Sequence, residues 1–154
     1  MKKISGFLIP IIICFLIGVS ASFIQSDSIE HWYPFLNKPT LTPPNIVFPI
    51  AWSILYLCMG ISIGFIINSD STRKKYFIGL FALQLFLNFM WSILFFYFKN
   101  PFWGLIDILA LDIIIINYSI RTYKEFRVSS LLFIPYIAWV TFASYLNLYI
   151  LYNN

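Results

Sequence analysis

Charge is scarce in this chain. Its 154 residues include ten basic and six acidic side chains, so that 10% are charged, whereas 60% are hydrophobic. Soluble domains carry about 25% charged residues, and so few charges cannot give a globule of this length a polar surface. A disordered chain is excluded as well, because disordered segments are polar. The class that remains is a membrane protein.

Cysteine and histidine are almost absent too. The two cysteines, Cys14 and Cys58, exclude a secreted disulfide scaffold. The single histidine, His31, cannot form a metal site with the usual number of ligands. The chain also lacks a phosphate-binding loop, a nucleophile elbow and a zinc motif, and no basic cluster exceeds three residues. We therefore expect no metal, no required cofactor, no nucleic-acid partner and no conventional hydrolase.

What the chain has instead is five long apolar runs. They cover roughly residues 4–24, 46–67, 76–98, 102–120 and 128–151, and about 20 apolar residues suffice to cross a hydrocarbon core as a helix. The runs do not alternate with the period of two that barrel strands show. Because short links make successive helices antiparallel neighbours, the sequence predicts an all-α membrane protein. We expect a single domain over residues 1–154, a bundle of five transmembrane helices.

The basic residues separate into two groups by position. Two bases form the smaller group: Lys38 lies between the first and second spans, and Lys99 lies between the third and fourth. Eight lie before the first span, between the second and third, or between the fourth and fifth: Lys2, Lys3, Arg73, Lys74, Lys75, Arg121, Lys124 and Arg127. The positive-inside rule then predicts a cytoplasmic N-terminus and an external C-terminus. A cleaved signal peptide is the alternative for the first run, which is however longer than the usual core of about 7–15 residues.

One connection is long. Residues 25–45 contain His31, Trp32 and Tyr33, followed by Lys38-Pro39 and Pro43-Pro44. Long loops are commonly functional or disordered, and the prolines and aromatic residues favour a folded cap over one end of the bundle.

Three of the predicted helices carry a stripe that combines a tryptophan with small or polar residues. Polar side chains inside a membrane are costly and tend to face the bundle interior. The stripes are compatible with packing between helices or with an aromatic cavity that binds a small molecule. They comprise Gln84, Asn88, Trp91 and Phe95; Trp52, Tyr56 and Gly60; and Trp139, Ala143 and Asn147.

The fourth run contains two carboxyl groups, Asp107 and Asp112. Five residues correspond to about 140° around a helix, so the two are not a catalytic pair. No base inside a span can pair with them, and we expect one or both to be protonated or hydrogen-bonded to another helix. A proton-coupling role stays open. Gly60 and Gly64 form a GxxxG pattern, which serves either a dimer interface or packing within the chain.

Several motifs follow one another in a recognisable order. The first half has Trp32-Tyr33, Leu36-Asn37-Lys38-Pro39, Pro43-Pro44, Trp52, Leu55-Tyr56 and Met59-Gly60. The second half has Gln84-Leu85, Asn88, Trp91, Gly104, Asp107, Pro135-Tyr136-Ile137-Ala138-Trp139, Phe142-Ala143 and Leu146-Asn147. Together they resemble the TspO/translocator protein family, also called tryptophan-rich sensory proteins or peripheral benzodiazepine receptors. The resemblance covers nearly the whole chain, including the number of spans.

The resemblance implies a five-helix bundle, commonly a homodimer, in a membrane that we expect to be a bacterial cell membrane. It also implies binding of porphyrins such as protoporphyrin IX, and of isoquinoline carboxamide or benzodiazepine ligands, in a pocket under the first loop. Carried over by motif, the pocket walls are Tyr33, Pro43, Pro44, Trp52, Tyr56, Asn88, Trp91, Asp107, Trp139, Ala143 and Leu146. Sterol binding is not expected, because no base follows Leu146 and Tyr149.

Three functions remain in order of preference. The first is a sensory or regulatory protein that binds tetrapyrroles. The second is light- and oxygen-dependent porphyrin breakdown, in which Trp52 and Trp139 react. The third is transport of porphyrin or lipid. Because porphyrin propionates are costly to bury alone, Lys38 is added as a candidate partner; the alternatives are a solvated lysine or one that holds the loop closed.

Overall fold

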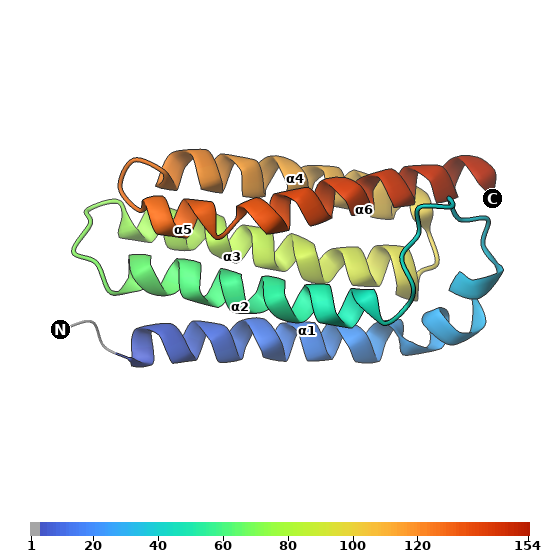
Figure 1. Cartoon of the computed structure of the whole chain (residues 1–154), viewed down its shortest axis with the longest axis horizontal. Helices are drawn as coiled ribbons and strands as arrows, with labels where there is room; N and C mark the ends of the chain where they lie inside the picture. The colour runs from blue at the N-terminus through green and yellow to red at the C-terminus, as the bar shows by residue number, and fades with distance from the viewer. Residues whose placement is uncertain (1–3) are drawn as a thin grey trace.

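Five long helical segments run side by side in the computed structural model, which describes residues 4–154 (Figure 1). All five are long and apolar enough to cross a membrane, and no strand occurs among the described residues. The predicted all-α membrane bundle of five spans is therefore confirmed. The elements are α1 (Ser5–His31), η1 (Tyr33–Phe35), α2 (Val47–Ile67), α3 (Lys74–Trp91), η2 (Ser92–Tyr97), α4 (Pro101–Thr122), α5 (Arg127–Leu131) and α6 (Ile134–Asn153).

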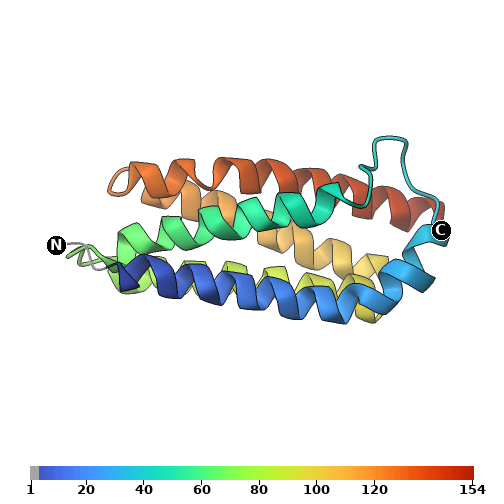
Figure 2. The same cartoon turned by 60° about the horizontal axis from the view of Figure 1, so that its bottom comes forward.

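The first helix is longer than predicted. We expected a loop from residue 25, whereas α1 continues to His31. Its last turns are polar, but their side chains have partners on the neighbouring segment: Gln25 Nε2 donates to Ser92 Oγ over 2.6 Å, and Ser28 Oγ donates to the Phe96 carbonyl. The connection to α2 is correspondingly shorter and covers residues 32–46, which project at the C-terminal end of the bundle (Figure 2).

The third span changes its helical type near its end. After Trp91 the chain continues as the π-helical segment η2, a form that frequently occurs at functional sites. The Phe98 amide bonds the Ile93 carbonyl, five residues back. Lys99 then adopts a φ of 51°, and the Asn100 side chain caps α4 by accepting from the Trp103 amide. The chain thereby reverses within a few residues.

The fifth span is two helices and not the single one predicted over 128–151. Pro135 has no N–H to donate to the carbonyl four residues earlier, so the helix is interrupted at residues 132–133. Serines then fix the short α5. Ser129 Oγ donates to the Ser62 carbonyl on α2, and Ser130 Oγ donates to the Ser119 carbonyl on α4, both over 2.7 Å.

The GxxxG pattern of α2 packs within the chain. A Cβ atom on Gly60 would stand 2.6 Å from the Cα of Ile11, and one on Gly64 would stand 2.4 Å from the Phe7 ring. The structure therefore supports packing within the chain and not a dimer interface at these glycines, because α1 occupies this face of α2 and leaves no room for a second chain.

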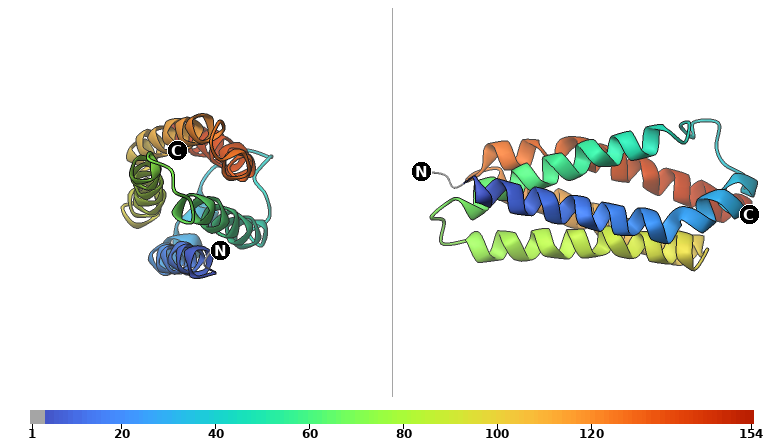
Figure 3. Two further views of the ribbon diagram at one scale, coloured as in Figure 1. Left: turned by 90° about the vertical axis from the view of Figure 1, so that its left-hand side faces the viewer. Right: turned by 90° about the horizontal axis from the view of Figure 1, so that it is seen from below.

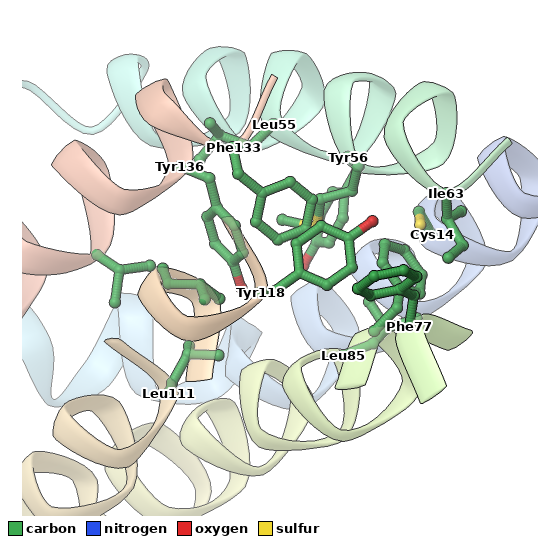
Figure 4. Packing of buried hydrophobic residues seen from close by; sticks show 14 of the residues in the cluster. Cys14, Leu55, Tyr56, Ile63, Phe77, Leu85, Leu111, Tyr118, Phe133 and Tyr136 are labelled. Atoms are coloured by element: carbon green, nitrogen blue, oxygen red, sulfur yellow. The ribbon is translucent and has the colours of Figure 1, made fainter. Parts of the chain in front are cut away.

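The end-on view shows α1 beside α2, and α4 beside both α3 and α6 (Figure 3). Towards its N-terminal end the backbone of α2 lies apart from that of α6, whereas its other end packs against α5 (Figures 1 and 3). An aromatic core fills the interior of the bundle. There the Tyr118 and Phe133 ring centroids are 4.3 Å apart, and Tyr136 lies close by (Figure 4). At the end covered by the first loop the bundle encloses a cavity, which is described below.

The α2–α3 and α4–α5 connections lie together at the opposite end, and six of the ten bases lie in them or in the adjoining helix ends (Figure 1). Lys2 and Lys3 lie outside the described residues. Which compartment each end faces, and with it the cytoplasmic N-terminus, stays a prediction.

Candidate functional site

A cavity of about 520 Å³ occupies the loop-covered end, between α1, α2, the end of α3 with η2, and α6. This volume lies within the range of small-molecule sites, about 300–1,000 Å³. None of its lining residues is acidic, basic or histidine. Seven of the residues carried over from the family motifs line it: Tyr33, Trp52, Tyr56, Asn88, Trp91, Ala143 and Leu146.

Two stacked aromatic pairs form much of the wall. On α2, the Trp52 and Tyr56 rings are 5.6 Å apart and inclined by 28°. At the junction of α3 and η2, the Trp91 and Phe95 rings are 5.3 Å apart and inclined by only 15°. Offset-stacked rings attract one another beyond the area that they bury. The pairs therefore hold flat, apolar faces in defined positions along the cavity.

Amide side chains fix the orientation of these rings. Tyr56 Oη donates to Asn88 Oδ1 over 2.9 Å, and Asn88 Nδ2 donates to Tyr136 Oη over 3.0 Å. Trp91 Nε1 donates to Asn147 Oδ1 over 3.2 Å, and Asn147 Nδ2 donates to the carbonyl of Pro101 over 2.7 Å. The amide side chains predicted on the third and fifth spans thus connect four helices, α2, α3, α4 and α6.

The first helix forms a wall that the sequence analysis missed. Its lining residues are Phe15, Gly18, Val19, Ala21, Ser22, Gln25 and Ile29. A Cβ atom on Gly18 would stand 2.3 Å from the Tyr56 ring, so only glycine permits this approach. α1 has no tryptophan within its apolar run, and the one signal was the spacing of the small residues Gly18, Ala21 and Ser22.

Five predicted site residues do not line the cavity. Four of them were expected as walls, which the structure corrects, and Lys38 was expected only as a propionate partner. Three belong to the loop: Lys38, Pro43 and Pro44. Lys38 Nζ donates to the carbonyls of Tyr33, Pro34 and Leu36 over 2.7 to 3.3 Å. Partial burial lowers the pKa of Lys38 and raises the pKa of Tyr33. The ammonium group therefore holds the loop in shape, which is one of the two alternatives to a propionate partner.

The other two corrected residues are Trp139 and Asp107. The Trp139 indole packs edge-on against Phe48, 5.8 Å away, and Phe48 lines the cavity. Trp139 thus supports the wall from behind. Asp107 is buried, with 7% of its surface exposed, and its Oδ2 has no hydrogen-bond partner among residues 4–154. Asp112 accepts a hydrogen bond from Thr141 of α6 over 3.0 Å, which is one of the two alternatives that the sequence left open.

No three side chains of histidine, cysteine, aspartate or glutamate come together within the described part of the chain. The cavity instead offers ring faces, four amide side chains and three serine hydroxyls: Gln25, Asn45, Asn88 and Asn147, with Ser22, Ser53 and Ser92. Such a wall suits a flat, largely apolar molecule with a few hydrogen-bonding atoms.

The family model for TspO/MBR matches residues 10–153. The chain is 42% identical to the tryptophan-rich protein TspO of Archaeoglobus fulgidus over 131 residues, 85% of each chain. It is 36% identical to the protein of the same name from Chlorobaculum tepidum, over 99% of this chain and 98% of that one. It is 32% identical to the translocator protein of Sus scrofa, over 76% of this chain and 71% of that one.

Proposed function

This chain is a multi-pass membrane protein that belongs to the TspO/MBR family, and we propose that it binds porphyrins and other flat aromatic ligands in the cavity under its first loop. One observation carries the proposal: a cavity of about 520 Å³ without a charged lining residue, whose wall includes the indoles of Trp52 and Trp91. Indoles supply a large, rigid contact area for a flat ring system. Protoporphyrin IX and isoquinoline carboxamide or benzodiazepine compounds are the ligand classes to test.

The role that we propose is sensory or regulatory, exerted by a protein of the bacterial cell membrane that forms a homodimer. Its chemistry is binding: the lining residues offer flat faces and amide groups, and they include no acid, base or histidine to act as a proton-transfer catalyst. Transport ranks lower, since five spans without an internal repeat do not suggest alternating access.

Light- and oxygen-dependent porphyrin breakdown is the second candidate. The Trp52 indole favours it, because this side chain lines the cavity and an indole is readily oxidised beside an excited porphyrin. Trp139, the other tryptophan considered for this reaction, lies behind Phe48 and would not touch the ring directly.

The test is a dark titration of the detergent-solubilised protein with protoporphyrin IX, followed by tryptophan quenching and porphyrin absorbance. We expect saturation at one ligand per chain and displacement by a neutral isoquinoline carboxamide, since both compete for one cavity. Quenching that never saturates would contradict the proposal. Saturable porphyrin binding from which the carboxamide displaces no porphyrin would contradict it as well.

Illumination of the saturated complex in air then separates binding from breakdown. If the protein only binds porphyrin, the bound porphyrin should bleach at the same rate as free porphyrin. Faster bleaching, with a new product, that is lost in Trp52→Phe would assign the second function.

A further inference from the structure

A second hollow lies at the end of the bundle opposite the cavity. It has a volume of about 630 Å³ and is lined by three bases, Arg73, Arg121 and Lys124, and by three isoleucines, Ile113, Ile116 and Ile120. We call it the basic groove. It lies along the last turns of α4 and beside the α2–α3 and α4–α5 connections, which share one end of the bundle (Figure 1).

The apolar half of the basic groove is a stripe on the outer face of α4. Ile113, Ile116 and Ile120 follow one another at spacings of three and four residues, and therefore lie on one side of the helix. Ile113 and Ile120 keep 66% and 69% of their surface exposed, so no helix within residues 4–154 covers the stripe. It extends roughly 10 Å along the helix axis, at 1.5 Å per residue, from the membrane interior to the bases.

The basic half is held in place by hydrogen bonds. Arg121 Nε donates to Asn117 Oδ1 over 3.0 Å, one turn back on α4. Arg73 Nη1 donates to Glu125 Oε1 over 2.8 Å, and its guanidinium lies 4.8 Å from the centre of the Phe77 ring. Each guanidinium is thus anchored on one side, which leaves further N–H groups for an oxyanion.

The charges at the groove do not cancel. Glu125 is ionised, since hydrogen bonds from Ser71 and Arg73 lower the pKa of its carboxyl group, and it offsets Arg73. Arg121 and Lys124 have no carboxylate within salt-bridge distance among residues 4–154. A positive excess of two charges therefore stands at the end of an apolar stripe.

We propose that the basic groove binds one anionic phospholipid, with its phosphate between Arg121, Lys124 and Arg73 and an acyl chain along Ile113, Ile116 and Ile120. The two halves match the two parts of such a lipid in order along the membrane normal, and basic pockets at the ends of transmembrane helices are known to bind phosphate headgroups. A soluble phosphate compound would use the bases alone and would leave the isoleucine stripe without a function.

The test is native mass spectrometry of the detergent-solubilised protein with dioleoyl-phosphatidylglycerol or dioleoyl-phosphatidylcholine. We expect one phosphatidylglycerol to remain bound per chain at concentrations at which phosphatidylcholine does not. The double variant Arg121→Gln/Lys124→Gln should weaken phosphatidylglycerol binding about 30-fold, because each base near an anionic headgroup contributes roughly 1 kcal/mol to the binding free energy. The matched control is Lys75→Gln/Arg127→Gln, which removes two bases of the same end that lie outside the groove.

Equal losses in the two double variants would overturn the proposal, because attraction to the whole basic end would then explain the binding. Unchanged binding in Arg121→Gln/Lys124→Gln would overturn it as well. Glycerol 3-phosphate supplies the headgroup without the chains, and displacement of the lipid by this compound at equal concentration would contradict the role of the isoleucine stripe. Circular dichroism of each variant verifies the helical fold.

Discussion

The indole Nε1 of Trp91 donates a hydrogen bond to Asn147 Oδ1, 3.2 Å away, across the cavity end of the bundle. Asn147 is itself held by the Pro101 carbonyl at the start of α4. One amide thus joins α3, α4 and α6 and orients a ring that lines the cavity.

Asn147→Ala should therefore destabilise the bundle and weaken ligand binding together. A buried donor left without a partner costs about 1–3 kcal/mol, and we expect a loss of that size in the free energy of unfolding. Thermal unfolding in detergent and a porphyrin titration measure the two effects. Asn153→Ala is the control on the same helix, because the Asn153 side chain is exposed and, among residues 4–154, bonds only the Tyr149 carbonyl. Equal effects of the two changes would count against the role of the Asn147 amide.

Gly18→Ala tests the close approach of α1 to Tyr56. The added Cβ atom would lie 2.3 Å from the tyrosine ring, which must then move away from Asn88. Overpacking of this kind typically costs about 1–3 kcal/mol, and we expect lower thermal stability and weaker ligand binding.

Gly79→Ala is the matched control for this change. Apart from its chain neighbours and the nearby backbone of α3, no atom of the described residues lies within 4 Å of a Cβ at that position, so the substitution should stabilise α3 by up to about 1 kcal/mol through helix propensity. A Gly18→Ala variant as stable as this control would show that α1 does not press against Tyr56.

Ala143→Leu should fill part of the cavity without unfolding the protein. Ala143 lines the cavity, and three more carbon atoms there would occupy space that the ligand needs. We expect an affinity loss of about tenfold, which corresponds to about 1.4 kcal/mol, with little change in melting temperature. Ala138→Leu places the same side chain on an exposed position of α6 and should leave affinity unchanged; equal affinities of both variants would remove Ala143 from the site.

Lys38→Gln distinguishes a loop tie from a propionate partner. The ammonium group donates to three loop carbonyls, including that of Tyr33. The variant should therefore weaken porphyrin and a neutral carboxamide equally, by up to about fivefold, since a partly exposed contact contributes about 0–1 kcal/mol. A loss confined to the porphyrin would instead assign Lys38 to a propionate.

Much of the site was visible in the sequence because polar side chains in an apolar run need partners. Asn88 and Asn147 stood out for that reason, and both bond side chains of other helices. The spacing of Trp52, Tyr56 and Gly60 placed them on one stripe, although Gly60 packs against α1 and only the two aromatic residues face the cavity.

Three features could not be predicted from residue spacing. Trp139 shares a stripe with Ala143, but spacing sets only the direction of the Cα–Cβ bond, and the long indole reaches Phe48 instead. Gln25 follows the apolar run and resembled a loop residue, since its partner Ser92 lies 67 residues away. The π-helical segment η2 depends on tertiary contacts such as Ser28 to Phe96, which no local pattern encodes.

The most direct test of the proposed site is the affinity of protoporphyrin IX, measured by equilibrium dialysis in the dark, for three variants in each of which one tryptophan is replaced by leucine. Trp52 lines the cavity, Trp139 supports Phe48 from behind, and Trp103 is exposed at the start of α4. We predict a loss of about tenfold or more for Trp52→Leu, since a ring contact contributes about 0.5–1.5 kcal/mol beyond the area lost. Trp139→Leu should lose less, and Trp103→Leu should bind as the unaltered protein does. Equal affinities of all three variants would contradict the assignment of the cavity as the binding site.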